Sequence, residues 1–113
     1  MVIQSNCKFA KNINAPTVSK VFPNAEGDIL AVQVSGDFSS GIVHIEGRSD
    51  PSGDWVSLAG VSLGDLAVAR GGITKPGMYE IGVVGVREIR ANIESVSGGK
   101  MSVFGQIIST EET

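Results

Sequence analysis

Few residues of this chain are of the types that support catalysis or metal binding. His44 is the single histidine and Cys7 is the single cysteine. Together they cannot supply the three or four ligands of a zinc site. A catalytic histidine needs an activated nucleophile and an orienting acid beside it, whereas His44 lies on the polar side of an alternating run. We therefore expect a solvated or rim histidine, no catalytic residue, no metal and no cofactor.

Acidic and glycine-rich turns are the next candidates for chemistry. Asp50 and Asp54 share one turn and could hold calcium, but this turn lacks the DxDxDG loop with a terminal Glu that indicates such a site. Gly71-Gly72 and Gly98-Gly99 are not followed by the helical pattern that a phosphate-binding loop requires. We expect turn-forming carboxylates and ordinary β-turns at these positions.

Aromatic residues make up 5% of the chain, and Trp55 and Tyr79 are the only residues of their kinds. This is little material for the exposed aromatic platform of a sugar-binding module. Trp55 follows a turn and begins a strand, so we interpret it as a core or rim anchor. A surface binding role for Trp55 is the alternative.

Composition narrows the classes of partner. The 113 residues suit one domain with a real hydrophobic core. The net charge is -3 and the basic residues are scattered singly from Lys8 to Lys100, so we expect no nucleic-acid partner. Charged residues make up 19% of the chain, below the roughly 25% of typical soluble domains. Either a partner shields part of the surface, or this is a Gly-rich β protein with uncharged polar faces.

Cysteine usage and apolar runs bear on the location of the protein. One cysteine cannot form an internal disulfide, which suits synthesis in a reducing host cytoplasm. The first residues, MVIQSNCKFAKN, lack the apolar core of a signal peptide. No stretch approaches 18 apolar residues, so we expect no membrane partner.

Short runs rich in Val and Ile lie between 15 glycines. Glycine inside a helix costs roughly 1 kcal/mol, and branched side chains favour strands. Most of these runs alternate between apolar and polar residues, as in antiparallel sheets with one buried face. This pattern predicts an all-β fold, an antiparallel β-sandwich of jelly-roll or immunoglobulin-like type. About eight strands are expected, near 17–22, 29–35, 42–48, 55–59, 61–68, 78–84, 87–95 and 101–109.

Turn chemistry suggests how some of these strands connect. Pro51 and Gly53 lie between the strands expected at 42–48 and 55–59, which predicts a hairpin there. Residues 97–100, Ser-Gly-Gly-Lys, predict a second hairpin between the last two strands. Residues 61–70 could instead form a short helix, but Gly64 and the valines favour a strand.

The two ends of the chain differ from its middle. Residues 1–16 are polar with isolated apolar positions, and residues 110–113 are polar. We interpret 1–16 as an N-terminal arm, 17–109 as the sandwich domain and 110–113 as a tail. Apolar side chains on an arm favour burial against a neighbour. The expected assembly residues of the arm are Val2, Ile3, Phe9 and Ile13.

Two segments together resemble a known group of proteins. These are VQVSGDFSSGIVHIEGRSDPSGDWVSL and KPGMYEIGVVGVREIRANIESVSGGKMSVFGQI, which span residues 32–107. The first contains a VxxEGxxD…W pattern, here Val43 to Asp50 with Trp55, and the second a GxYxxxVxGxxxxR stretch beginning at Gly77. The order is similar to that of small bacteriophage virion accessory proteins with a β-sandwich fold.

The resemblance implies a virion protein that docks on the capsid or the tail. It further implies that the partners are other copies of the chain and other virion structural proteins. A carbohydrate- or receptor-binding module is the alternative function. An enzyme of unfamiliar type ranks below both.

Overall fold

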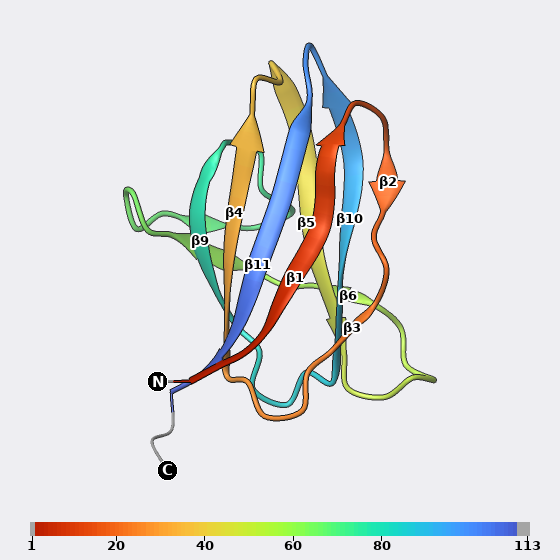
Figure 1. Cartoon of the computed structure of the whole chain (residues 1–113), viewed down its shortest axis with the longest axis vertical. Helices are drawn as coiled ribbons and strands as arrows, with labels where there is room; N and C mark the ends of the chain where they lie inside the picture. Colours follow the sequence, from red (N-terminus) through yellow and green to blue (C-terminus); the bar gives the residue numbers. More distant parts are fainter. Residues whose placement is uncertain (1, 111–113) are drawn as a thin grey trace.

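The structure is a computed structural model that describes residues 2–110. These residues form two antiparallel sheets packed face to face (Figure 1). The strand order is β1-β11-β4-β9-β7-β8 in the six-stranded sheet and β2-β10-β5-β6 in the five-stranded sheet, where β3 also pairs with β10. No helix occurs between residues 2 and 110. The prediction of an all-β antiparallel sandwich is therefore confirmed.

The long strands agree closely with the runs of alternating residues, and the short strands lie at the sheet margins. The six-stranded sheet contains β1 (Val2–Ile13), β11 (Met101–Ser109), β4 (Ile29–Gly36), β9 (Gly77–Gly82), β7 (Gly60–Ser62) and β8 (Val68–Ala69). The five-stranded sheet contains β2 (Thr17–Val18), β3 (Phe22–Pro23), β10 (Glu88–Ser97), β5 (Ser40–Arg48) and β6 (Val56–Ser57).

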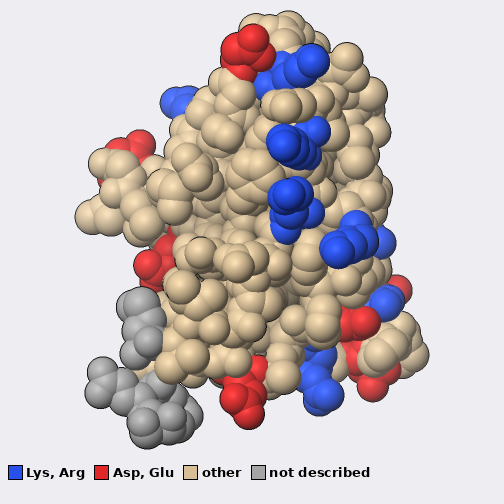
Figure 2. Space-filling model, viewed as in Figure 1, with Lys and Arg blue, Asp and Glu red and all other residues tan. Residues whose placement is uncertain are grey.

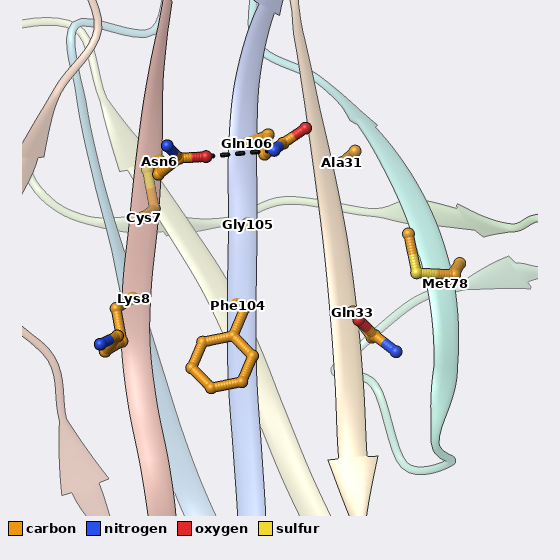
Figure 3. A pocket seen from close by; sticks show the side chains of 9 residues that line it. All are labelled: Asn6, Cys7, Lys8, Ala31, Gln33, Met78, Phe104, Gly105 and Gln106. Carbon is orange, nitrogen blue, oxygen red and sulfur yellow. Dashed lines mark hydrogen bonds between the residues drawn. The ribbon is translucent and has the colours of Figure 1, made fainter. Parts of the chain in front are cut away.

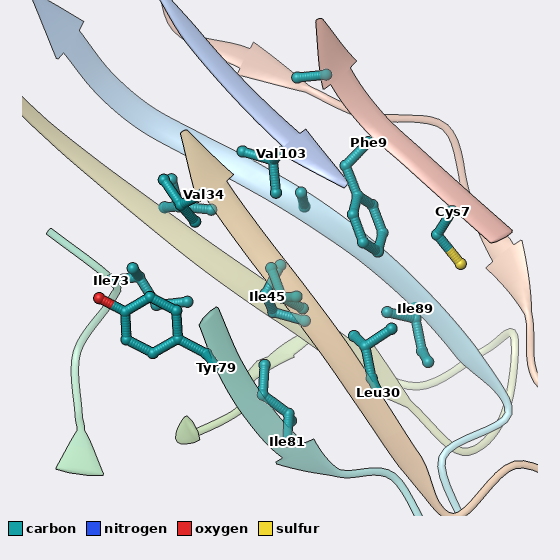
Figure 4. Packing of buried hydrophobic residues seen from close by; sticks show 14 of the residues in the cluster. Cys7, Phe9, Leu30, Val34, Ile45, Ile73, Tyr79, Ile81, Ile89 and Val103 are labelled. Atoms are coloured by element: carbon teal, nitrogen blue, oxygen red, sulfur yellow. The ribbon is translucent and has the colours of Figure 1, made fainter. Parts of the chain in front are cut away.

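Branched aliphatic residues from both sheets fill the core (Figure 4). Leu30 and Ile81 come from the six-stranded sheet and meet Ile45 and Ile89 from the other, all at most 1% exposed. Burying each such side chain contributes roughly 1.5–3 kcal/mol. The inward-facing residues of the alternating pattern, which predicted the strands, therefore also provide most of the stabilisation.

The expectation of an N-terminal arm outside the sandwich is wrong for most of the segment. Residues 2–13 form β1, which pairs with β11 from Val2↔Ser109 to Ile13↔Met101. Cys7, Phe9 and Ala10 are buried in the core. Phe9 and Ala10 both face inward because the register shifts between Lys8 and Ala10. This bulge breaks the alternation and hides the strand in the sequence.

The predicted hairpin at residues 97–100 is also wrong, because β10 and β11 belong to different sheets. The turn instead carries the chain from one sheet to the other. A second crossing, from β4 to β5, lies against it: Asp37 accepts a hydrogen bond from the Lys100 amide (2.8 Å), and the Ser39 amide donates to the Ser97 carbonyl (2.9 Å). The two crossings thus stabilise each other at one end of the sandwich.

The other local predictions have mixed outcomes. The hairpin across residues 49–54 is confirmed, with Gly47 of β5 paired to Val56 of β6. Residues 61–70 contain no helix, but they form a small hairpin of β7 and β8 instead of one strand. The strand expected at 17–22 is divided into β2 and β3, both on β10.

Candidate functional site

His44 lies on the outer face of the five-stranded sheet, beside polar neighbours. Its Nε2 is 3.3 Å from Glu94 Oε1, and its Nδ1 is 3.3 Å from Ser57 Oγ. No group of three or more His, Cys, Asp or Glu side chains within residues 2–110 is placed to hold a metal ion. The position of His44 fits the rim histidine expected from the sequence.

Asp50 has the structural role expected of a turn-forming carboxylate. Its Oδ1 accepts hydrogen bonds from the Ser52 amide (2.9 Å) and the Ser52 hydroxyl (2.6 Å). The hydrogen bonds from Ser52 lower the pKa of Asp50 below its usual value. The Asp50 carbonyl also accepts from the Gly53 amide at 2.8 Å, which closes the turn.

The sequence analysis missed one motif. Residues 60–64 are GVSLG and match the Gly-x-Ser-x-Gly pattern of a nucleophile elbow. Such an elbow places the serine on a strained turn between a strand and a helix. Here Ser62 ends the short strand β7, and a β-turn to β8 follows it. His44 lies on the other sheet. The elements around Ser62 therefore lack the geometry of that nucleophile.

The outer face of the five-stranded sheet carries a network of paired charges. Arg48 Nε and Glu88 Oε1 are 2.8 Å apart, as are Arg90 Nε and Glu46 Oε1. Both pairs join directly opposed residues of β5 and β10. Trp55 lies on this network, with both guanidinium carbons 4.3 Å from its ring centroid. Trp55 is thus a half-buried rim anchor outside the hydrophobic core, and its ring binds two arginines.

The outer face of the six-stranded sheet has a contrasting composition. One row of opposed residues runs from Asn6 through Gln106, Ala31, Glu80 and Val61 to Val68. The next row runs from Lys8 through Phe104 and Gln33 to Met78. Lys8 and Glu80 are the only charged side chains in these two rows. We call this surface, defined by these ten residues, the uncharged face.

A shallow pocket of about 280 Å³ lies on the uncharged face (Figure 3). The Phe104 ring lies between the Lys8 and Gln33 side chains, and Met78 lies on the far side of Gln33. Gln106 Nε2 donates a hydrogen bond to Asn6 Oδ1 at 3.1 Å. The pocket therefore combines apolar surface with amide groups.

The four residues expected to form an assembly arm differ in how far they are buried. Phe9 is buried in the core of its own domain, so it is not available to a partner. Ile13 is partly buried against the same core. Val2 and Ile3 are exposed near the start of β1. Their role in assembly stays a prediction, and of the polar tail only Thr110 belongs to the described residues.

The alternating pattern of the sequence places Glu46, Arg48 and Arg90 on the polar sides of their strands. It does not show which of these residues face each other, because the pattern of one strand does not fix its register against the next. It also missed Phe104 and Met78 on the uncharged face. A usable signal was present, since both residues occupy polar positions of alternating strands.

These features define the class of the protein as a small antiparallel β-sandwich whose ion pairs, among residues 2–110, all lie on the outer face of the five-stranded sheet. Its sequence matches the XepA family over residues 4–107, and the chain belongs to that family. A comparison with curated protein sequences gave no significant match.

Two solved structures share the fold. The chain is similar to SPBc2 prophage-derived protein YomS, with a TM-score of 0.84, 18% identity and 96% of each chain covered. It is also similar to PBSX exported protein XepA, with a TM-score of 0.82 and 26% identity over 93% of this chain. The match covers 37% of XepA, so that protein extends well beyond the shared domain. The prophage origin of YomS agrees with the resemblance to phage proteins.

Proposed function

We propose that this protein is a phage-derived accessory protein that docks on a structural protein of the capsid or tail. It is made in the host cytoplasm, assembles as an oligomer, acts by binding and not by catalysis, and resides in the virion. Its membership of the XepA family and the prophage origin named for YomS support a phage setting. The docking role is our proposal from the surface of the molecule.

The observation that carries the proposal is the difference between the two outer faces. All three ion pairs found among residues 2–110 join side chains of the five-stranded sheet. The uncharged face instead exposes Met78 and Val61 beside Phe104 and several amides. Protein interfaces are depleted of charge at their centre and enriched in aromatic residues and Met. The uncharged face therefore has the composition of a docking surface for another protein.

Self-association is the second part of the proposal. Closed symmetric assemblies are the commonest form of soluble oligomers. The long strand β1 is an edge of its sheet, and Val2 and Ile3 are exposed on it. Apolar residues on a sheet edge favour contact with another chain. We place contact between subunits at the start of β1, around Val2 and Ile3, which leaves the uncharged face for the virion.

Cosedimentation with particles of the phage that encodes the protein tests the docking surface. Met78, 42% exposed, can be changed to Glu without disturbing the core, and the charge should abolish cosedimentation. Val84→Glu is the matched control, because Val84 is 79% exposed on the turn that follows β9. Equal cosedimentation of both variants would refute docking through this face. Light scattering on the wild type measures the oligomer, and a monomer would refute that part.

A further inference from the structure

Four lysines that are scattered in the sequence lie along one edge of the sandwich. Lys8 and Lys11 are exposed on β1. Lys100 precedes Met101, which pairs with Ile13 at the end of β1. Lys20 lies 5.0 Å from the centroid of the Phe22 ring, which in turn meets the ring of Phe9 on β1. We call Lys8, Lys11, Lys20 and Lys100 the lysine row.

The bulge in β1 brings the first two lysines onto the same side. Residues three apart on a regular strand point to opposite faces. Because Phe9 and Ala10 both face inward, Lys8 and Lys11 both face solvent. Their Cα atoms are about 10 Å apart, at roughly 3.3 Å per residue. The irregularity that hid β1 in the sequence thus also aligns two positive charges.

The charges of the lysine row are not neutralised within residues 2–110. None of the four ammonium groups forms an ion pair there, since the ion pairs involve Arg and His. Asp37 contacts this row through the Lys100 backbone amide, which donates a hydrogen bond to Asp37 Oδ1 (2.8 Å). Figure 2 shows basic side chains in a column down the face where β1 and β11 lie in Figure 1. A negative net charge therefore coexists with one positive edge.

The neighbours of the lysine row indicate the chemistry of its ligand. Asn6, Asn12 and Gln106 are exposed beside it and offer amide groups to hydroxyls. Phe22 is buried, and Phe104 beside Lys8 is only partly exposed, so the row lacks the series of exposed aromatic side chains on which successive nucleic-acid bases stack. The charges form a column, which suits a chain of regularly spaced anions better than a broad surface.

We propose that the lysine row binds an anionic polysaccharide, a sugar chain that carries phosphate, sulfate or carboxylate groups at intervals. The lysines attract the anions, and the amides of β1 and β11 bind the hydroxyls between them. This surface shares Asn6, Lys8 and Gln106 with the uncharged face, but Met78 lies at the far end of its row from Lys8. Met78→Glu therefore tests docking, and substitutions of Lys11 and Lys100 test the lysine row.

The test compares two variants of equal charge. Lys11→Gln/Lys100→Gln removes half of the row and leaves Lys8 and the uncharged face intact. Arg70→Gln/Lys75→Gln makes the same change of charge between β8 and β9. Titration calorimetry with a heparin oligosaccharide at low salt gives the affinity, and circular dichroism confirms that each variant is folded.

We expect heparin binding by the wild type and the control, with affinity that falls as salt rises. The row variant should bind roughly tenfold more weakly, and its affinity should depend on salt about half as steeply. Equal affinities of both variants, or no heparin binding by the wild type, would overturn the proposal. Tighter binding of single-stranded DNA or of anionic phospholipid vesicles than of heparin would also overturn it, in favour of that other partner.

Discussion

The ring of Phe9 fills the space that a side chain at position 105 would need. A Cβ atom on Gly105 would lie 2.9 Å from Phe9 Cε2 and 3.1 Å from Leu30 Cδ1. Phe9 also meets Phe22 edge to face, with ring centroids 5.1 Å apart. Phe22 belongs to β3 on the five-stranded sheet, so this contact joins the two sheets beside β1. The first strand is thereby part of the core.

Phe9→Ala should therefore destabilise the protein by about 3–5 kcal/mol, the usual cost of removing a buried aromatic ring. Gln4→Ala is the matched control on the same strand. The Gln4 side chain is polar and exposed, so its truncation should cost less than about 1 kcal/mol. Urea denaturation followed by circular dichroism measures both. Similar losses for the two variants would mean that Phe9 does not anchor β1.

The bulge that buries Phe9 in β1 shows why the sequence predicted the fold class better than the details of the fold. β5 alternates strictly and β10 alternates as far as Ile93, so their period of two was visible. In β1 the bulge puts Phe9 and Ala10 on one side, and the pattern is lost. Turn residues at 97–100 suit a hairpin or a crossing equally, because both require positive φ. Neither the lysine row nor the Trp55 contacts could be inferred without the register between strands.

The crossing between β10 and β11 depends on glycine at position 98. Gly98 has a φ of +74°, and the hydroxyl of Ser39 occupies the position where a Cβ would project. Gly85 has a similar φ of +80° with no atom within 4 Å of its Cβ position. Gly85→Ala should cost about 1 kcal/mol from backbone strain alone, and Gly98→Ala should cost more. Equal shifts of the thermal midpoint would show that Ser39 does not restrict the turn.

Trp55 should contribute modestly to stability, because its ring lies on two arginines outside the core. Each contact of this kind at a partly exposed site contributes roughly 0.5–1 kcal/mol. Trp55→Ala should therefore cost about 1–2 kcal/mol, below the 3–5 kcal/mol of a core aromatic. Trp55→Phe keeps a ring and should recover part of the loss. A cost above about 3 kcal/mol in urea denaturation would instead place the ring in the core.

Cys7 should make the stability sensitive to alkaline pH. Burial raises the pKa of the Cys7 thiol above its usual value of 9.0, against the opposing effects of Ser5 and Lys20. The folded state therefore holds this proton more tightly than the unfolded state. The resulting stability is present below the unfolded pKa and is lost as pH rises through the folded pKa.

Burial also raises the pKa of Tyr79, so Tyr79 contributes part of the loss of stability at alkaline pH. Unfolding free energies of wild type and Cys7→Ala at about pH 8 and about pH 10 isolate the thiol, and the wild type should lose more. Parallel losses in both proteins would show that Cys7 titrates alike in the folded and unfolded states.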